Sequence, residues 1–285
     1  MPPAPVTVAL PVLNGGRLLG EVLAAVNAQE VEQPVELLVI DSGSTDGSQQ
    51  LARDHGARVV EIAPGEFSHG RTRNRLMELA GGTHVAFLTQ DALPAHPRWL
   101  AALLRGFGLA GDVALVFGPQ RPRRDASPMV RRELLEAFAR FGAEGIDNGH
   151  FFSSANGAVA RWAWERVPFP DVAYGEDHEL ARDMLAAGLS KAYVPDAEVL
   201  HSHDHPPLKA FRRYFDDYRA LAAVNGLREP LTPRYIAARV RNDVAADRAF
   251  MRREGLEVET LRSLRHHIAR ALGRSLGTNA DRWRR

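Results

Sequence analysis

One short segment concentrates groups that could move a proton. Glu176, Asp177 and Glu179 place three carboxylates beside His178, just after Gly175, at the expected start of a helix. Neighbouring carboxylates raise one another's pKa, which suits a general base. Acidic residues also stabilise a helix N-terminus through the helix dipole, so composition alone leaves a catalytic and a structural role open.

Two further segments carry groups that could bind a metal ion. Three histidines, His201, His203 and His205, follow a short expected strand, and His201 and His203 share one face of an extended segment. Imidazole is a good ligand for divalent metals. Asp91 directly follows an apolar strand, where a carboxylate can hold a hard cation that binds phosphate in turn. The alternatives are packed strand-end histidines and an Asp that caps the next helix.

Residues 67–74 lead from a Gly turn into a helix and contain Arg71 and Arg73. Arginine side chains and a helix N-terminus together suit a diphosphate. Ordinary surface charge is the alternative for these two residues.

The elements that must position these groups alternate between strand and helix over the first 118 residues. Short apolar runs predict buried parallel strands, and amphipathic segments predict the helices between them. Strands are predicted at 6–12, 35–40, 57–62, 83–88 and 113–117, and helices at 17–29, up to 55, 71–80 and 97–107. Thr45 or Asp46 is expected to cap the second helix. Such a sheet binds ligands where its strands end, here at Pro11–Asn14, Asp41–Ser44 and Gln90–Asp91.

After Pro119 the alternation loosens. The pattern predicts a helix over 129–141, a loop over 142–156, a helix over 180–187 and short strands at 192–194 and 198–201. Helices are predicted over 208–225, 233–253 and 257–272. We therefore expect a catalytic domain over 1–205, with halves near 1–118 and 119–205, and a helical extension over 206–285.

The composition is that of a globular protein of 285 residues, with 45% hydrophobic and 25% charged residues, which excludes a disordered chain. No apolar run reaches the ~18 residues of a membrane span. Cysteine is absent, which excludes disulfides, thiolate ligands and thiolate nucleophiles. The first residues lack the basic and apolar regions of a signal peptide, so a cytoplasmic location is expected.

Charge is distributed unevenly along the chain. Residues 206–285 contain 18 Lys and Arg and 9 Asp and Glu, a formal charge of +9, which leaves −8 for residues 1–205. A basic region suits an anionic surface, and solvated helix faces are the alternative. Phe211, Tyr214, Phe215 and Tyr218 recur at helical spacing there. They are expected to face lipid, to pack on the catalytic domain or to form a dimer.

In their order along the chain, these motifs resemble the inverting nucleotide-sugar glycosyltransferases of the GT-A fold, in the large family 2. Pro11–Asn14 is similar to the first-strand motif of that family, Val39–Asp46 to its base-binding motif, Thr89–Asp91 to its Asp-x-Asp metal motif and Glu176–Asp177 to its catalytic acidic pair. Residues 67–74, 87–94 and 199–203 resemble the rhamnosyltransferase-like subgroup. The resemblance implies an α/β GT-A fold with a Rossmann-like, mostly parallel sheet, flanking helices and a C-terminal helical extension.

The resemblance also implies a reaction. The enzyme would move a sugar, such as L-rhamnose from dTDP-rhamnose, to a hydroxyl of a saccharide or lipid-linked acceptor in cell-surface polysaccharide synthesis. Asp177, beside Glu176, would deprotonate that hydroxyl. Asp91 would bind Mg²⁺ or Mn²⁺, with His201 or His203 as a late-chain ligand. The residues implied in nucleotide binding are Pro11, Asn14, Asp41, Ser42, His69, Arg73 and Gln90.

One departure and two other classes of protein bear on this hypothesis. Gln90 stands where many relatives have an acid, which implies weaker metal dependence. A nucleotidyltransferase would show a Gly-rich basic loop after the first strand, where this chain has only Gly15-Gly16-Arg17. A degenerate nucleotide-binding protein would not need Asp41, Asp91 and Asp177. The expected partners are the donor and the acceptor, with no nucleic acid. Peripheral contact of the basic helices with the inner membrane face and a homo-oligomer are further hypotheses.

Overall fold

The computed structural model describes residues 4–172 and 174–283. The chain divides into two compact units. The first, here called the sheet unit, runs up to Arg121 and resumes over Arg140–His201. The second, here called the helical unit, combines Pro122–Ala139 with the part of the chain after Ser202. Residues 122–139, predicted to belong to the catalytic domain, thus cluster with the C-terminal helices.

The sheet unit is built on an eight-stranded sheet in the order β3-β2-β1-β4-β9-β6-β10-β8. Its strands are β1 (Val6–Val12), β2 (Val35–Asp41), β3 (Arg58–Glu61), β4 (His84–Leu88), β6 (Val113–Phe117), β8 (Gly145–Ile146), β9 (Asn156–Ala160) and β10 (Ser190–Tyr193). β1 is parallel to β2 and β4, β2 to β3, and β10 to β6. β9 is antiparallel to both of its neighbours, and β8 is antiparallel to β10. The short strands β5 (Leu93–Pro94), β11 (Val199–Leu200) and β7 (Gln120–Arg121) form a second sheet.

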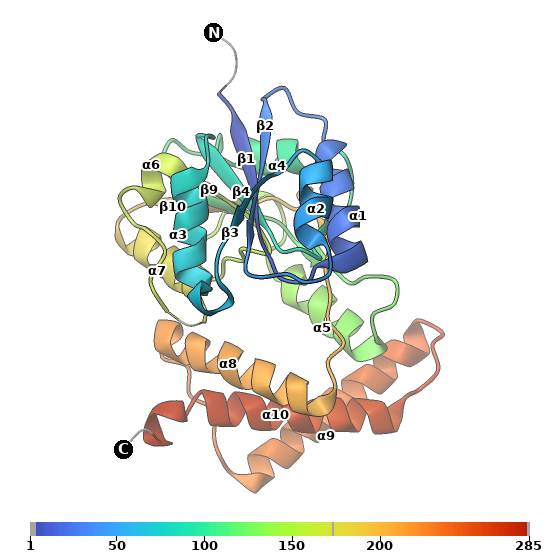
Figure 1. Ribbon diagram of the computed structural model, residues 1–285. Helices are drawn as coiled ribbons and strands as arrows, with labels where there is room; N and C mark the ends of the chain where they lie inside the picture. The colour runs from blue at the N-terminus through green and yellow to red at the C-terminus, as the bar shows by residue number, and fades with distance from the viewer. Residues whose placement is uncertain (1–3, 173, 284–285) are drawn as a thin grey trace. The chain divides into compact units, whose positions relative to one another are not determined.

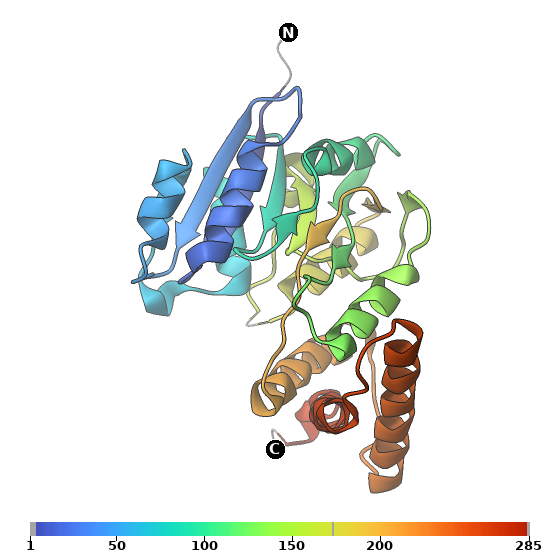
Figure 2. The same ribbon diagram turned by 90° about the vertical axis from the view of Figure 1, so that its right-hand side faces the viewer.

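Helices cover both faces of the large sheet (Figures 1 and 2). α1 (Gly16–Asn27), α2 (Ser48–Asp54) and α4 (Trp99–Gly106) lie on one face, and α3 (His69–Leu79), α6 (Arg161–Trp164) and α7 (Glu176–Ala186) lie on the other. A short 3₁₀ helix, η1 (Pro64–Glu66), precedes α3. Alternate β1 residues Val6, Val8 and Leu10 share one hydrophobic cluster with α1 and α4, and Ala9 on the opposite side is also buried. The continuous apolar runs of the sequence therefore correspond to strands covered on both sides.

Most predicted elements are confirmed, some residue for residue (6–12, 113–117 and 233–253) and others with ends shifted by a few residues. The predicted loop over 142–156 was wrong in part, because it contains β8 and runs into the buried strand β9. The predicted cap of α2 was also wrong. Its N-cap is Gly47, with φ +89°, while Asp46 Oδ1 accepts a hydrogen bond from Ser48 N at 3.0 Å.

The helical unit contains α5 (Pro128–Ala139), α8 (Pro207–Asn225), α9 (Pro233–Arg253), α10 (Thr260–Gly277) and the 3₁₀ helix η2 (Ala280–Trp283). α10 packs closely on α8 at Gly273. A Cβ at this position would lie only 2.7 Å from the Phe211 carbonyl oxygen. Tyr214 and Tyr218 of α8 lie under Arg270 and Arg274 of α10. At least these two members of the predicted aromatic stripe thus pack inside the helical unit. Within the described residues, no helix is both long and apolar enough to cross a membrane.

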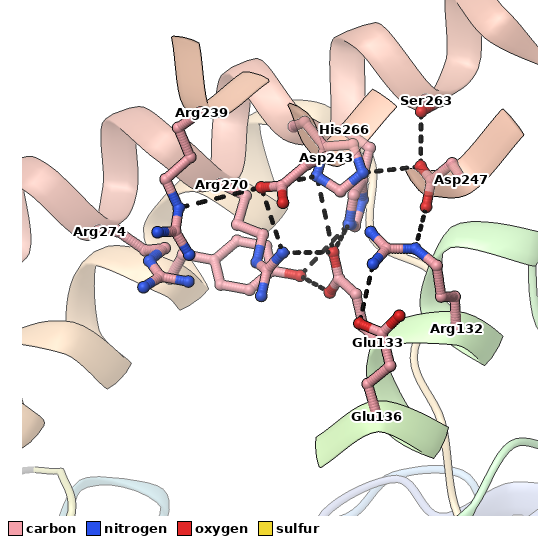
Figure 3. A network of polar contacts seen from close by, with 12 residues as sticks. Arg132, Glu133, Glu136, Arg239, Asp243, Asp247, Ser263, His266, Arg270 and Arg274 are labelled. Atoms are coloured by element: carbon pink, nitrogen blue, oxygen red, sulfur yellow. Dashed lines mark hydrogen bonds and ion pairs between the residues drawn. The ribbon is translucent and has the colours of Figure 1, made fainter. Parts of the chain in front are cut away.

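Polar groups fill much of the interior of the helical unit (Figure 3). Asp247 of α9 is fully buried. It accepts hydrogen bonds from Arg132 Nε at 2.6 Å and Ser263 Oγ at 2.5 Å, and it lies 2.7 Å from His267 Nε2. These contacts join α5, α9 and α10 through one carboxylate.

Glu133 of α5 is the second centre of this network. Its Oε2 accepts from the Tyr214 hydroxyl at 2.8 Å, and its Oε1 lies 3.0 Å from His266 Nε2 and 3.1 Å from Arg270 Nη1. Burial works to raise the pKa of Glu133, but these partners outweigh it and lower the pKa to about 2. Glu133 is therefore an ionised carboxylate held by three partners from two other helices.

Candidate active site

The turns that follow β1 and β2 are bonded to each other. Asn14 N donates to Ser44 Oγ at 2.8 Å, and Asn14 Oδ1 accepts from Thr45 N at 2.9 Å. Gly15 N donates to Ser48 Oγ at 2.9 Å. Asn14 has a positive φ of 50°, a conformation that Asn adopts more readily than most residues. Parallel pairing of β1 and β2 brings these turns to the same sheet edge, as predicted.

Asp41 organises the turn after β2. This carboxylate is fully buried. Its Oδ1 accepts from Gly43 N at 3.0 Å, Ser44 N at 2.8 Å and Gln49 Nε2 at 2.8 Å, and its Oδ2 accepts from Ser44 Oγ at 2.5 Å. A carboxylate has about four lone-pair sites, so Oδ2 keeps the capacity to accept another bond.

Two neighbours complete this edge. Ser42 N donates to Val12 O at 3.0 Å, and Ser42 Oγ donates to the same carbonyl at 3.1 Å. Pro11 is half-buried in β1 opposite Ile40. Pro11, Asn14, Asp41 and Ser42, all predicted nucleotide contacts, thus lie at one edge of the sheet.

Gln90 pairs with the backbone of Leu13. Its Oε1 accepts from Leu13 N at 2.8 Å, and its Nε2 donates to Leu13 O at 3.1 Å. An amide supplies both the acceptor and the donor that this pairing needs, whereas an ionised acid supplies no donor. The departure from an acid at this position therefore has a structural reason, and Gln90 anchors the segment carrying Asp91 to the end of β1.

Asp91 faces His201. The distance between Asp91 Oδ1 and His201 Nε2 is 3.5 Å. On the other side of the ring, His201 Nδ1 lies 2.8 Å from Gln120 Oε1, while Gln120 Nε2 donates to Ser153 Oγ at 2.8 Å. Gln120 thus contacts Nδ1 of the His201 ring, and the other ring nitrogen, Nε2, faces Asp91.

Asp91 and His201 are the residues here that would hold a divalent cation. Carboxylate oxygen and imidazole nitrogen are both ligands that Mn²⁺ accepts, so the donor chemistry of Asp91 and His201 fits a divalent metal. His203 belongs to the helical unit, and its role as a ligand stays a prediction.

Arg73 of α3 and Glu176 of α7 form a buried ion pair. Arg73 Nη1 lies 2.7 Å from Glu176 Oε1, and the two side chains are 6% and 5% exposed. Arg73 Nη1 also donates to His69 O at 3.2 Å. Burial raises the pKa of Glu176 to about 7, with Arg73 opposing the shift and Asp177 adding to it. The guanidinium of Arg73, which was predicted to contact the donor, is thus paired with Glu176 of the acidic pair.

Asp177 lies in the first turn of α7, after Gly175 at φ +83°. Its Oδ2 accepts from Ser154 N at 3.2 Å, and its Oδ1 accepts from His178 N at 2.9 Å. The side chain is only half-buried. Backbone N–H donors from two segments therefore hold a carboxylate that a substrate hydroxyl can approach.

The rest of the predicted segment 67–74 divides into two parts. The His69 ring packs edge to face on Tyr174, with 5.8 Å between ring centres. Asn74 instead supports the fold, since its Oδ1 accepts from Trp164 Nε1 at 2.8 Å and its Nδ2 donates to Phe169 O at 2.8 Å.

Sequence reasoning missed Gln120 and Ser154, which orient His201 and Asp177. Gln120 follows the buried strand β6, so the rule that identified Asp91 after β4 could have found it as well. Ser154 carried no such signal, because it acts through its backbone N–H and precedes a strand that was not predicted.

Comparison with known proteins agrees with this geometry. The family model described as glycosyl transferase family 2 matches residues 7–161. The chain belongs to glycosyl transferase family 2. It is 32% identical over 222 residues to the O-antigen chain rhamnosyltransferase WbaN of Salmonella anatum, covering 74% of this chain and 70% of the relative. It is 33% identical over 224 residues to RfbN of Salmonella typhimurium, with the same coverage.

Two solved glycosyltransferase structures share the fold of this chain. A mannosyltransferase from Pyrobaculum calidifontis, solved with GDP-Man and Mn²⁺, superposes with a TM-score of 0.64 at 19% identity, covering 96% of this chain and 87% of that one. Glucosyl-3-phosphoglycerate synthase from Mycobacterium tuberculosis, solved with Mn²⁺ and UDP, gives a TM-score of 0.59 at 24% identity, covering 79% and 81%. The α/β GT-A prediction is therefore confirmed.

Proposed function

We propose that the protein is an inverting rhamnosyltransferase, which moves L-rhamnose from dTDP-rhamnose to a hydroxyl of a saccharide or lipid-linked acceptor during assembly of a cell-surface polysaccharide. The proposed reaction type rests on the placement of Asp177. This residue is a half-buried carboxylate that accepts hydrogen bonds from Ser154 N and His178 N. The two Salmonella O-antigen rhamnosyltransferases support the choice of sugar.

Asp177 accepts the proton of the acceptor hydroxyl as that oxygen attacks the anomeric carbon, on the side opposite the diphosphate. One base is enough for this displacement, whereas hydrolases place two carboxylates across the bond. Asp177 accepts hydrogen bonds from two backbone N–H groups, which hold its carboxylate in a fixed position for this transfer. The ion pair of Arg73 and Glu176 fixes the start of α7, and with it the position of Asp177.

The donor binds along the edge formed by β1, β2 and β4. Pro11 and Asn14 line the base and ribose, with Ser42 beside them, and the buried Asp41 holds the turn after β2 that lies next to the base. Asp91 Oδ1 and His201 Nε2 hold Mg²⁺ or Mn²⁺. When bound, the metal supplies positive charge that stabilises the departing nucleoside diphosphate.

The proposal includes a place of action. The relative from Mycobacterium tuberculosis, 28% identical over 217 residues, is named an N-acetylglucosaminyl-diphospho-decaprenol L-rhamnosyltransferase. A lipid-linked acceptor of this kind would place the present protein at the inner face of the cell membrane, as a peripheral protein. Association with a second copy stays a hypothesis.

Thermal unfolding with dTDP, UDP and GDP, each with Mn²⁺, tests the donor, because a ligand that binds the native state raises Tm. We expect the largest rise with dTDP. Release of dTDP from dTDP-rhamnose, with and without a saccharide acceptor, then tests the reaction. A larger rise with GDP or UDP, together with no turnover of dTDP-rhamnose, would overturn the choice of donor.

A further inference from the structure

The outer face of α9 carries a stripe of four arginines. Arg234, Arg241, Arg248 and Arg252 are separated by seven, seven and four residues, so they lie along one side of the helix. All four are exposed. At about 1.5 Å per residue the stripe is about 27 Å long. We call this set the arginine stripe.

Among residues 4–172 and 174–283, no acidic side chain forms an ion pair with the arginine stripe. The two acids of α9, Asp243 and Asp247, point the other way, into the network of Figure 3. Asp247 is fully buried, and Asp243 Oδ2 lies 3.6 Å from Arg270 Nη1. Within the described residues, no stripe side chain has an ion pair or hydrogen bond. The positive charge of this face is therefore available to an external partner.

Several other exposed arginines of the chain are paired with acids. Arg53 Nη2 lies 2.5 Å from Glu61 Oε1, and Arg75 Nη1 lies 3.0 Å from Glu78 Oε2. Even on α9, Arg253 Nε lies 3.1 Å from Glu254 Oε1. The four arginines of the stripe therefore gather positive charge along one face of α9.

The side chains between the arginines are small. The exposed residues that share the stripe with them are Ala237, Ala245 and Ala249. No aromatic side chain is available on this face for base stacking, which single-stranded nucleic acid would need. The four guanidinium groups lie in a row, and the side chains between them are short, so all four can contact a flat layer of phosphates. The phosphates of such a layer do not have to match the spacing of the arginines.

We propose that the arginine stripe of α9 docks the protein on an anionic phospholipid bilayer. The proposal gives a specific surface to the membrane contact considered above, and it rests on the proposed function only in that a lipid-linked acceptor gives such docking a use. Binding is electrostatic, because the stripe has no large apolar side chain to insert. It therefore requires anionic lipid and weakens with salt, which screens exposed charges over about 10 Å at 0.1 M.

Co-sedimentation of the full-length protein with vesicles tests the proposal. One set contains phosphatidylcholine alone, and the other adds phosphatidylglycerol. We expect binding only to the anionic set, with loss at high salt. The double variant Arg241→Glu/Arg248→Glu is expected to reduce the partition coefficient by at least about 30-fold, from the loss of two basic contacts.

The matched control is Arg212→Glu/Arg265→Glu, which changes the net charge equally at exposed arginines of α8 and α10. The control is expected to keep most of the binding. Equal losses in both double variants, or no binding of wild type to anionic vesicles at low salt, would overturn the proposal. Binding to duplex or single-stranded nucleic acid in place of vesicles, lost in the stripe variant, would overturn it too.

Two measurements keep docking separate from the transferase assignment. Circular dichroism and Tm of the stripe variant should match wild type, since these side chains have no partners to lose. Release of dTDP in the absence of vesicles should also be unchanged. Failure of dTDP-rhamnose turnover in wild type would overturn the choice of donor and leave vesicle binding as an independent result.

Discussion

Two buried glutamates in this protein lie beside arginines and yet have opposite pKa shifts. Glu176 of the sheet unit is 2.7 Å from Arg73, and its pKa is raised to about 7. Glu133 of the helical unit is 3.1 Å from Arg270, and its pKa is lowered to about 2. Burial opposes the charged form of both groups, so burial alone does not decide the sign.

The remaining neighbours decide it. Glu133 also has His266 and the Tyr214 hydroxyl, so its charge is fully compensated. Glu176 has Asp177 next to it, and the second negative charge cancels part of what Arg73 contributes. An incompletely compensated carboxylate is typical of functional sites, whereas a satisfied network rigidifies a core. The comparison separates a region built for reaction from one built for support.

The largest expected effect is on catalysis. Asp177→Asn should lower kcat by about 10²–10⁴-fold, the usual contribution of a general base, because the amide cannot accept the acceptor proton. Affinity for dTDP should stay within a few-fold. Steady-state kinetics with dTDP-rhamnose measure this, with Asp183→Asn, farther along α7, as the control. Near wild-type turnover in Asp177→Asn would remove the proton-transfer role.

The next effect is on stability and separates the two glutamates. Glu133→Gln should lower the free energy of unfolding by about 3 kcal/mol, because buried Arg270 loses the nearer of its two carboxylate partners and keeps only Asp243 at 3.6 Å. At pH 6, Glu176→Gln should cost much less, because Glu176 is already largely protonated there. Urea denaturation of both variants beside wild type checks this. Equal losses would mean that the two glutamates do not differ in the way their surroundings indicate.

A smaller effect is expected at the proposed metal ligands. Asp91→Ala should weaken dTDP binding about tenfold when Mn²⁺ is present and leave it nearly unchanged with chelator. Calorimetry under both conditions measures the difference, and Asp196→Ala, an exposed acid outside the site, is the control. Equal weakening with and without the metal would show that Asp91 contacts the nucleotide directly.

The smallest effect is the pH dependence of stability. The folded pKa of Glu176 lies above its unfolded value, so its favourable contribution is present at low pH and is lost as pH rises from about 4.5 through 7. For Glu133 the folded pKa is depressed, so its contribution is present above about 4.5 and is lost as pH falls toward 2. Each slope is at most about 1.4 kcal/mol per pH unit. Subtracting the curves of the Gln variants from wild type should give slopes of opposite sign, in different pH ranges.

The sequence predicted the residues at the carboxyl ends of β1, β2 and β4, because apolar runs followed by polar turns are a local signal. Asn14, Asp41 and Asp91 were found this way. The partner of Gln90 could not be predicted, since it is the backbone of Leu13, 77 positions away. The network around Glu133 could not be predicted either, because its members come from segments up to 133 positions apart.

β9, which the sequence analysis did not predict as a strand, is the strand that holds the large sheet together. β4 and β6 do not pair with each other, and β9 is the strand that joins them. Without it the large sheet would separate into two pieces, one carrying Asp41 and Asp91 and the other leading to Gln120. At the start of β9, Asn156 Oδ1 accepts a hydrogen bond from Trp99 Nε1, and Asn156 Nδ2 donates to Pro119 O and Ala197 O. These bonds attach β9 to segments on both sides of it. β9 therefore makes the two pieces of the sheet one cooperative folding unit, in which loosening either piece disturbs the other.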